Sequence, residues 1–118
     1  MSESRREEFS VAQFFEGREK FAALMHVTFG LVGEAMGWPT RNVRAWLALK
    51  TGHCDAVRWP SDSARLFVPH SMTDMNRAEL ETFWDDAREL IRREVIPYVD
   101  ARAGEEIGWR IDDLRKVS

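Results

Sequence analysis

The hexapeptide MNRAEL, residues 75–80, carries the clearest structural signal in this chain of 118 residues. Asn76 is a residue type favoured as a helix N-cap, and Glu79 follows three positions later, as in a capping box. The methionine and the leucine at the two ends of the hexapeptide have the spacing of a hydrophobic staple. The pattern therefore predicts a helix that begins at Arg77.

The helix predicted downstream of this box is amphipathic. Its apolar residues recur at intervals of three and four, which keeps them on one helical face. This stripe comprises Leu80, Phe83, Trp84, Ala87, Ile91 and Val95. Pro97 limits the helix to about Ile96, because a proline ring clashes with the preceding turn. The opposite face predicts a solvated surface of ion pairs and carries Glu81, Asp85, Arg88, Glu89 and Arg92.

A first helix is predicted over residues 18–37. Its apolar positions again follow one face and comprise Phe21, Leu24, Met25, Phe29, Val32 and Met36. Gly37 is placed as a C-terminal glycine, with a proline shortly after it. Gly30 and Gly33 are unfavourable inside a helix, so they indicate a close approach between helices.

A second, shorter helix is predicted over residues 40–52. Thr40 is expected as its N-cap and Gly52 as its end. One face of this helix carries Val43, Trp46, Leu47 and Lys50. Trp46 is therefore expected in the core.

The segment that follows, residues 54–70, changes to short β-compatible runs on either side of the turn-rich sequence PSDSA. This pattern predicts a β-hairpin with a loop of a few residues. A lone two-stranded hairpin is only marginally stable, so we expect it to pack on the helices. The predicted fold class is α+β, with three main helices and a short β-hairpin between the second and the third.

The length of the chain suits one domain with a single core. We expect residues 1–16 to form a flexible lead-in that docks through Phe9, Phe14 and Phe15, and residues 17–118 to form the single α+β domain. Near the C-terminus, a few apolar residues are expected to dock on the body or on a partner, namely Ile107, Trp109, Ile111 and Leu114.

The composition excludes several classes of protein. One cysteine excludes an internal disulfide and fits a reducing compartment. No apolar run approaches the roughly 18 residues that a transmembrane helix needs. The charged start MSESRREEFS lacks the apolar core of a signal peptide, so a cytoplasmic protein is expected.

Charge is distributed unevenly along the chain, whose net charge is −3. Residues 37–70 hold five Lys/Arg and two acidic residues, whereas residues 71–118 hold eight basic and twelve acidic residues. A basic middle segment can bind a polyanion, because attraction to phosphate is set near the contact surface. A scatter of solvated arginines is the alternative, and charge alone does not separate the two.

The tripeptide His53-Cys54-Asp55 invites a catalytic or metal-binding interpretation. A zinc site needs three or four ligands at short spacing, and the other histidines lie far away in the sequence. Adjacent residues of a strand point to opposite faces, so His53 and Cys54 cannot form a nucleophile pair. We therefore predict no metal, no cofactor and no catalytic residue. His53 is expected to be structural, with its ring hydrogen-bonded to Asp55 or to a nearby backbone carbonyl.

The order of elements and several short motifs resemble the NinB (lambda Orf) recombination-mediator proteins of bacteriophages, and a related group of small phage proteins without assigned activity. The start of the first helix is similar to the family's R-K-aromatic-A-x-L pattern through Arg18, Lys20, Phe21, Ala22 and Leu24. The related group's R-A-W…G-H-aromatic-D segment is matched by Arg44, Ala45, Trp46, Gly52, His53 and Asp55. The entry to the last helix is similar through Ser71, Met75 and Glu79. Cys54 departs from the aromatic residue, and the chain has little room for the strands that the family carries before its first helix.

This resemblance implies a homodimeric phage protein that binds single-stranded DNA, contacts the host single-strand-binding protein and helps to load a recombinase. We also expect no enzymatic activity, because the sequence offers no complete catalytic site. Single strands are held by aromatic stacking and by Lys and Arg along the backbone. The candidate nucleic-acid-binding residues are Arg41, Arg44, Lys50, Arg58, Trp59 and Arg65.

An alternative function comes from the acidic character of the third predicted helix. A small acidic phage protein can inhibit a host defence complex, as anti-CRISPR proteins do, by occupying its nucleic-acid channel. In that case the partner-binding residues are Glu81, Asp85, Asp86 and Glu89.

Overall fold

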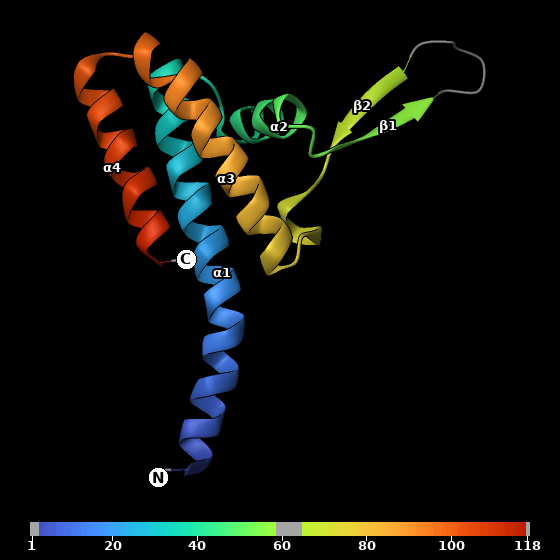
Figure 1. The fold of residues 1–118 in the computed structure, drawn as a ribbon, viewed down its shortest axis with the longest axis vertical. Helices are drawn as coiled ribbons and strands as arrows, with labels where there is room; N and C mark the ends of the chain where they lie inside the picture. Colours follow the sequence, from blue (N-terminus) through green and yellow to red (C-terminus); the bar gives the residue numbers. More distant parts are fainter. Residues whose placement is uncertain (1–2, 59–64, 118) are drawn as a thin grey trace.

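The structure, a computed structural model, describes the backbone of residues 3–58 and 65–117 and the side chains of 17–58 and 65–114. In chain order its elements are α1 (Glu3–Met36), α2 (Thr40–Lys50), β1 (Cys54–Arg58), β2 (Arg65–Pro69), the 3₁₀ turn η1 (Met72–Asp74), α3 (Arg77–Glu94), the 3₁₀ turn η2 (Ile96–Tyr98) and α4 (Ala101–Val117). We call the packed helices the body and the β1–β2 hairpin the arm, which projects away from the body (Figure 1).

The α+β class is confirmed, including the hairpin between the second and third helices. The tail adds a fourth helix, α4, which packs along α1. The first helix begins at Glu3, well before the predicted start at residue 18. Residues 3–16 contain strong helix formers and no proline, which explains why the helix extends in this direction. The side chains of the predicted lead-in lie outside the described residues.

One hydrophobic core fills the space between the helices. The stripes predicted for the first and third helices form most of it, with α4 supplying a further side. Its fully buried members include Phe21, Met25, Phe29, Val32, Val43, Leu47, Leu80, Phe83, Trp84, Ile91, Ile107 and Ile111. The ring of Phe29 lies 6.0 Å from those of both Phe83 and Trp84, centroid to centroid. Aromatic rings at this spacing add to the stabilisation that burial gives.

The capping box is present as predicted. The Asn76 Oδ1 atom accepts a hydrogen bond from the backbone N–H of Glu79 at 2.9 Å, and a Glu79 carboxylate oxygen accepts one from the Asn76 N–H at 3.1 Å. These two bonds satisfy donors that the first turn of a helix otherwise leaves unpaired. The staple residues Met75 and Leu80 are both buried, and α3 begins at Arg77.

Arg18 fixes the turn that leads into α3. Its guanidinium donates to the carbonyl oxygen of Met75 at 2.6 Å and to that of Met72 at 2.8 Å. The first helix therefore holds the segment between the arm and α3 through charge-assisted hydrogen bonds.

The corner between α1 and α2 depends on glycines. Gly37 has a φ of +74°, and the Trp38 N–H donates to the Gly33 carbonyl at 2.8 Å. A Cβ atom on Gly33 would lie 2.5 Å from the Trp38 carbonyl oxygen and 3.4 Å from Val43 of α2, so the tight approach at this glycine is with the corner and not with a second helix. A Cβ on Gly30 would make only an ordinary contact with Thr40, at 3.6 Å.

The predicted N-cap of α2 is wrong by one residue. Pro39 occupies the cap position, without a side-chain hydrogen bond, and Thr40 is the first helical residue. The proline ring fixes φ near −60°, which suits the entry to a helix and brings the chain into α2 one position earlier.

The expectation that the hairpin packs on the helices is also wrong for most of its length. Only the root of the arm lies against the body (Figure 1), and eight of the ten strand residues, 55–58 and 65–68, are exposed. Marginal stability of an isolated hairpin was the reason for that expectation. Anchoring at the root replaces packing along the strands.

Within residues 3–58 and 65–117, none of the helices is both long enough and apolar enough to cross a lipid bilayer.

Candidate nucleic-acid interface

The register of the arm sorts its side chains into two faces. The strands are antiparallel, and the paired residues are Cys54 with Pro69, Asp55 with Val68, Ala56 with Phe67, Val57 with Leu66 and Arg58 with Arg65. Successive residues of a strand alternate between faces. One face therefore carries Ala56, Arg58, Arg65 and Phe67, and we call it the basic–aromatic face. The other carries Asp55, Val57, Leu66 and Val68, and we call it the apolar face.

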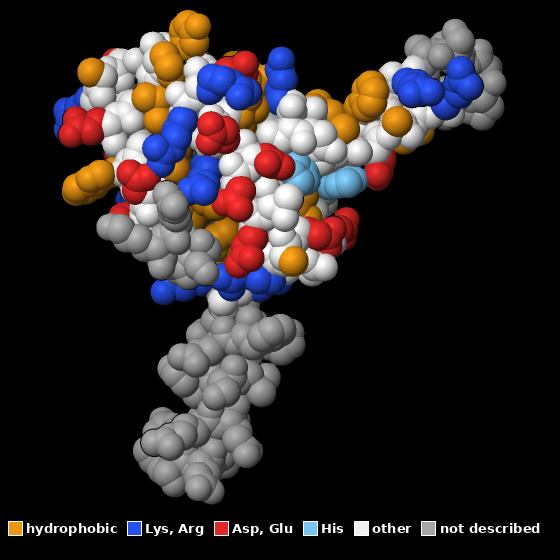
Figure 2. All heavy atoms as spheres, in the orientation of Figure 1, with side chains coloured by type: hydrophobic (Ala, Val, Ile, Leu, Met, Phe, Trp, Pro, Cys, Tyr) orange, Lys and Arg blue, Asp and Glu red, His pale blue; other side chains and the backbone are white. Residues whose placement is uncertain are grey.

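Large apolar side chains on both faces meet solvent. Leu66 and Phe67 are 59% and 58% exposed, and Val57 and Val68 are exposed as well. Figure 2 shows hydrophobic side chains along the arm, with Lys or Arg side chains toward its outer end. Contiguous apolar surface on an otherwise charged protein is typical of a binding site.

Arg58 and Arg65 stand directly opposite each other at the outer end of the described strands. Their Cβ atoms are expected about 5 Å apart, and like charges at that spacing destabilise a hairpin. Neither arginine forms an ion pair within the part of the chain that the structure describes. Among the described residues the two arginines therefore face like charge, and a bound anion would relieve the repulsion.

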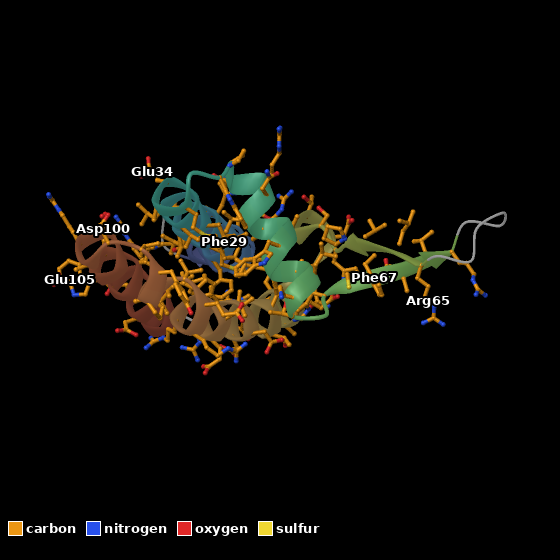
Figure 3. The ribbon with its side chains drawn as sticks, turned by 90° about the horizontal axis from the view of Figure 1, so that it is seen from above. Phe29, Glu34, Arg65, Phe67, Asp100 and Glu105 are labelled. Carbon is orange, nitrogen blue, oxygen red and sulfur yellow. The ribbon has the colours of Figure 1, made fainter. Side chains whose placement is uncertain are left out.

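The basic–aromatic face combines these two arginines with one aromatic ring. Arg65 and Phe67 are two positions apart on β2 and both lie on the arm away from the helices (Figure 3). Asp55, an acidic residue of the described strands, lies on the other face. An exposed ring beside two cations is the pairing that proteins use for unpaired bases and their phosphates.

Two histidines anchor the arm at its root. The His53 Nε2 atom lies 2.8 Å from Asp86 Oδ2 on α3, and the His53 ring packs 5.2 Å from the Phe83 ring. His70 Nε2 lies 2.9 Å from Asp55 Oδ1. The backbone N–H of His70 also donates to the backbone carbonyl of His53 at 2.9 Å, and this bond closes the base of the hairpin.

These contacts correct the predicted partner of His53, which is Asp86 and not Asp55. His53 precedes the strand, so the alternation of a strand does not govern it, and its ring turns toward α3. Asp55 projects from β1 and meets the histidine that follows β2. Long-range packing, which sequence spacing does not contain, decides both pairs.

The root also borders a hollow of about 280 Å³, lined by His53, His70, Met75, Ala78, Glu79 and Thr82. Within the described residues, no group of three or more His, Cys, Asp or Glu side chains is arranged to hold a metal ion. Cys54 is a free thiol of intermediate exposure beside this root.

The other predicted basic residues belong to α2, the helix that leads into the arm. Arg41 and Lys50 are exposed and Arg44 is half-buried. Figure 3 shows α2 beside the root of the arm. The structure thus brings Arg58 and Arg65 together at one end of the arm, whereas the three α2 residues lie on a separate element. Trp59 lies outside the described residues.

Trp46, expected in the core, is half-buried against it and packs edge-on with Trp38 at 5.9 Å between ring centroids. It is therefore not an open stacking surface.

Three of the four candidate acidic residues of α3 form ion pairs with neighbours among the described residues. Glu81 accepts from Arg77 at 3.0 Å, Asp85 lies 3.3 Å from Arg88, and Asp86 binds His53. Of these pairs, Asp85 with Arg88 lies within the ion-pair surface predicted for this face, and Glu81 pairs with a residue outside that set. The pairs also reduce the negative charge that the face could offer to a basic partner.

Phe67 is the candidate residue that the sequence reasoning missed. The alternation of RLFVP, residues 65–69, already puts the ring on the same face as Arg65, so the signal was present. The expectation that the hairpin is covered by helices concealed it. Comparisons with protein-family models, with characterised proteins and with solved structures gave no match to this chain.

Proposed function

We propose that this protein is a non-enzymatic, single-stranded DNA-binding accessory protein, and that the arm is its binding element. The observation that carries the proposal is the exposed Phe67 on the same face as the opposed Arg58 and Arg65. A ring stacks on any base, and paired arginines neutralise adjacent phosphates. A narrow arm of two strands reaches one strand of nucleic acid without needing a groove.

The apolar face of the arm suits a protein contact. Val57, Leu66 and Val68 are exposed on this face, and in the described two-stranded sheet each strand has one edge without a strand partner. Such edges accept an extended segment of a partner by strand addition. A host single-strand-binding protein fits this role, as expected from the resemblance to phage recombination mediators, and the proposed location is the cytoplasm of a host cell.

The direct test is fluorescence anisotropy with a labelled single-stranded oligonucleotide. We expect binding at low salt that weakens linearly with the logarithm of salt concentration. The double variant Arg58→Ala/Arg65→Ala should lower the slope by about 1.4, since each lost phosphate contact contributes about 0.7 for single strands.

The matched control removes two exposed cations from the body, as Lys20→Ala/Arg93→Ala. It lowers the net charge by the same amount but leaves the arm intact, so it should bind nearly as wild type does. Equal losses in both double variants would reduce the proposal to general charge attraction. Failure of the wild-type protein to bind at 50 mM salt would end it.

The acidic face of α3 supports a second function less well, because three of its four candidate carboxylates already have local partners. A pull-down from host lysate separates the two. Recovery of a nucleic-acid-guided defence complex, with loss of that recovery in Glu81→Lys/Glu89→Lys, would favour the inhibitor over the DNA-binding protein.

A further inference from the structure

The outer face of α4 is a second surface whose chemistry is unexplained by DNA binding. It borders an open hollow of about 580 Å³ lined by Arg102, Glu105, Glu106, Trp109, Arg110 and Asp113. Trp109 at its centre is 76% exposed. The opposite face of the same helix is buried in the core through Ile107, Ile111 and Leu114.

The charged residues of this face have no ion-pair partner among the described residues. The α4 residue that does form an ion pair there is Asp112, with Arg92 of α3, and it points to the side of the face. Glu105 lies on the outer side of α4, at the other end of the molecule from Arg65 (Figure 3). The α4 face is therefore separate from the arm.

The order of charges along the face is self-complementary. At about 100° per residue, Arg102, Trp109 and Asp113 lie within about 40° of one another and form its central stripe. Glu106 and Arg110 both lie to the same side of that stripe. A half-turn about an axis between residues 107 and 108 brings Arg102 to the height of Asp113, and Arg110 to within one residue of the height of Glu106. Each charge is then matched by one of opposite sign.

We infer that α4 pairs with α4 of a second copy of this chain, antiparallel, about a twofold axis that passes between residues 107 and 108. This arrangement sets Arg102 level with Asp113 of the partner subunit. Glu106 comes within about 1.5 Å of the height of Arg110 of the partner subunit, given a rise of about 1.5 Å per residue. The two copies of Trp109 lie about 4.5 Å apart along the axis by the same rise, which suits stacking across the twofold.

A second copy fits this face better than an unrelated partner, because an isologous interface requires the same patch to be complementary to itself. The face is also small. A helix of 17 residues is about 25 Å long and about 10 Å wide, which gives much less than the roughly 800 Å² per partner of a stable complex. The dimer is therefore weak and forms in a concentration-dependent manner.

Sedimentation velocity of the full chain, from about 10 µM to about 1 mM, tests the dimer, because this range brackets the affinity of so small an interface. We expect the weight-average mass to rise with concentration. Arg102→Asp should weaken self-association at least tenfold, since it opposes two carboxylates at each end of the interface. Trp109→Ala should weaken it as well, and both residues are exposed, so the fold is not affected.

Charge reversal gives the decisive outcome. The double variant Arg102→Asp/Asp113→Arg should dimerise as wild type does. The single variants Arg102→Asp and Asp113→Arg should each self-associate weakly. When the two are mixed they should form a heterodimer, because both charge pairs across the interface are then of opposite sign. Arg93→Asp, an exposed arginine of α3, is the matched control and should leave dimerisation unchanged.

A wild-type chain that stays monomeric up to about 1 mM would overturn the inference, as would a dimer that these substitutions do not change. Neither result bears on the arm, because the oligonucleotide assay measures DNA binding without requiring a dimer.

Discussion

The body and the arm use the same kinds of residue for opposite purposes. Phe83 on α3 is fully buried, in contact with other rings, whereas Phe67 on β2 is more than half exposed. The arginines of the two regions differ in the same way. The Arg18 guanidinium donates hydrogen bonds to backbone carbonyls of the body, whereas Arg58 and Arg65 lie opposite each other and have no ion-pair partner in the described part of the chain. Residue type therefore does not report the role. The role follows from whether the surrounding fold already satisfies the side chain.

The largest effect is expected from removing one ring of the body. Phe83→Ala should lower the free energy of unfolding by about 3–5 kcal/mol, because it leaves a cavity in a packed core. Chemical denaturation measures this change. If Phe83→Ala lowered the free energy of unfolding no more than a substitution on the arm does, the contrast between body and arm would be wrong.

A moderate effect is expected at the corner between α1 and α2. Gly33→Ala should destabilise the protein by about 1–3 kcal/mol, because the new Cβ would lie 2.5 Å from a backbone carbonyl that cannot move freely. Gly30→Ala is the matched control in the same helix. It meets only a side-chain hydroxyl at 3.6 Å and should stabilise the protein by up to about 1 kcal/mol through helix propensity. Thermal melts of the two variants should shift in opposite directions.

His53, at the boundary between the two regions, should have an intermediate effect. His53→Ala removes a hydrogen bond to Asp86 and the contact with the Phe83 ring, and we expect a loss of about 1–2 kcal/mol. His70→Ala breaks a more exposed pair with Asp55 and should change stability by less than about 0.5 kcal/mol. Urea titrations of both variants measure these losses and so show where the body ends and the arm begins. A His53 variant that unfolded like wild type but bound no DNA would show that this residue is functional.

For the number of residues removed, the smallest effect on stability is expected from deleting the arm itself. The His70 N–H already donates to the His53 carbonyl, as across a tight turn, so residues 54–69 can be replaced by Asn-Gly. The free energy of unfolding of the body should stay within about 1 kcal/mol of wild type, since eight of the ten described strand residues are exposed. DNA binding should be lost. Collapse of the body in this variant would contradict the division into two regions.

The sequence predicts the local features of this fold well. The capping box, the buried stripe of α3 and the turn at Gly52 each depend on residues within one or two turns of each other. The partners of His53 and Asp55 depend on segments that meet only after folding, so local spacing indicated the wrong pair. The hairpin was placed correctly, but its exposure was not, because a marginal hairpin gives no sign of where its support lies.

The candidate site was predictable in part for the same reason. Arg58 and Arg65 stand out as basic residues of the segment, but their direct opposition appears only with the register. The apolar repeat at Ile107, Ile111 and Leu114 was visible as well. Its docking on the body, which leaves Trp109 outside, required the packed structure.

The central claim is that the side chains of the body are satisfied by packing within the protein, whereas those of the arm need a ligand. Hydrogen–deuterium exchange with and without a single-stranded oligonucleotide tests this claim. In the free protein we expect slow exchange in α3 and fast exchange in β1 and β2, because the strands have little packing to protect them. Saturating oligonucleotide should slow exchange over residues 54–58 and 65–69 and leave α3 and α4 unchanged. Protection confined to α3 or α4, with an arm that exchanges as fast as before, would contradict the account.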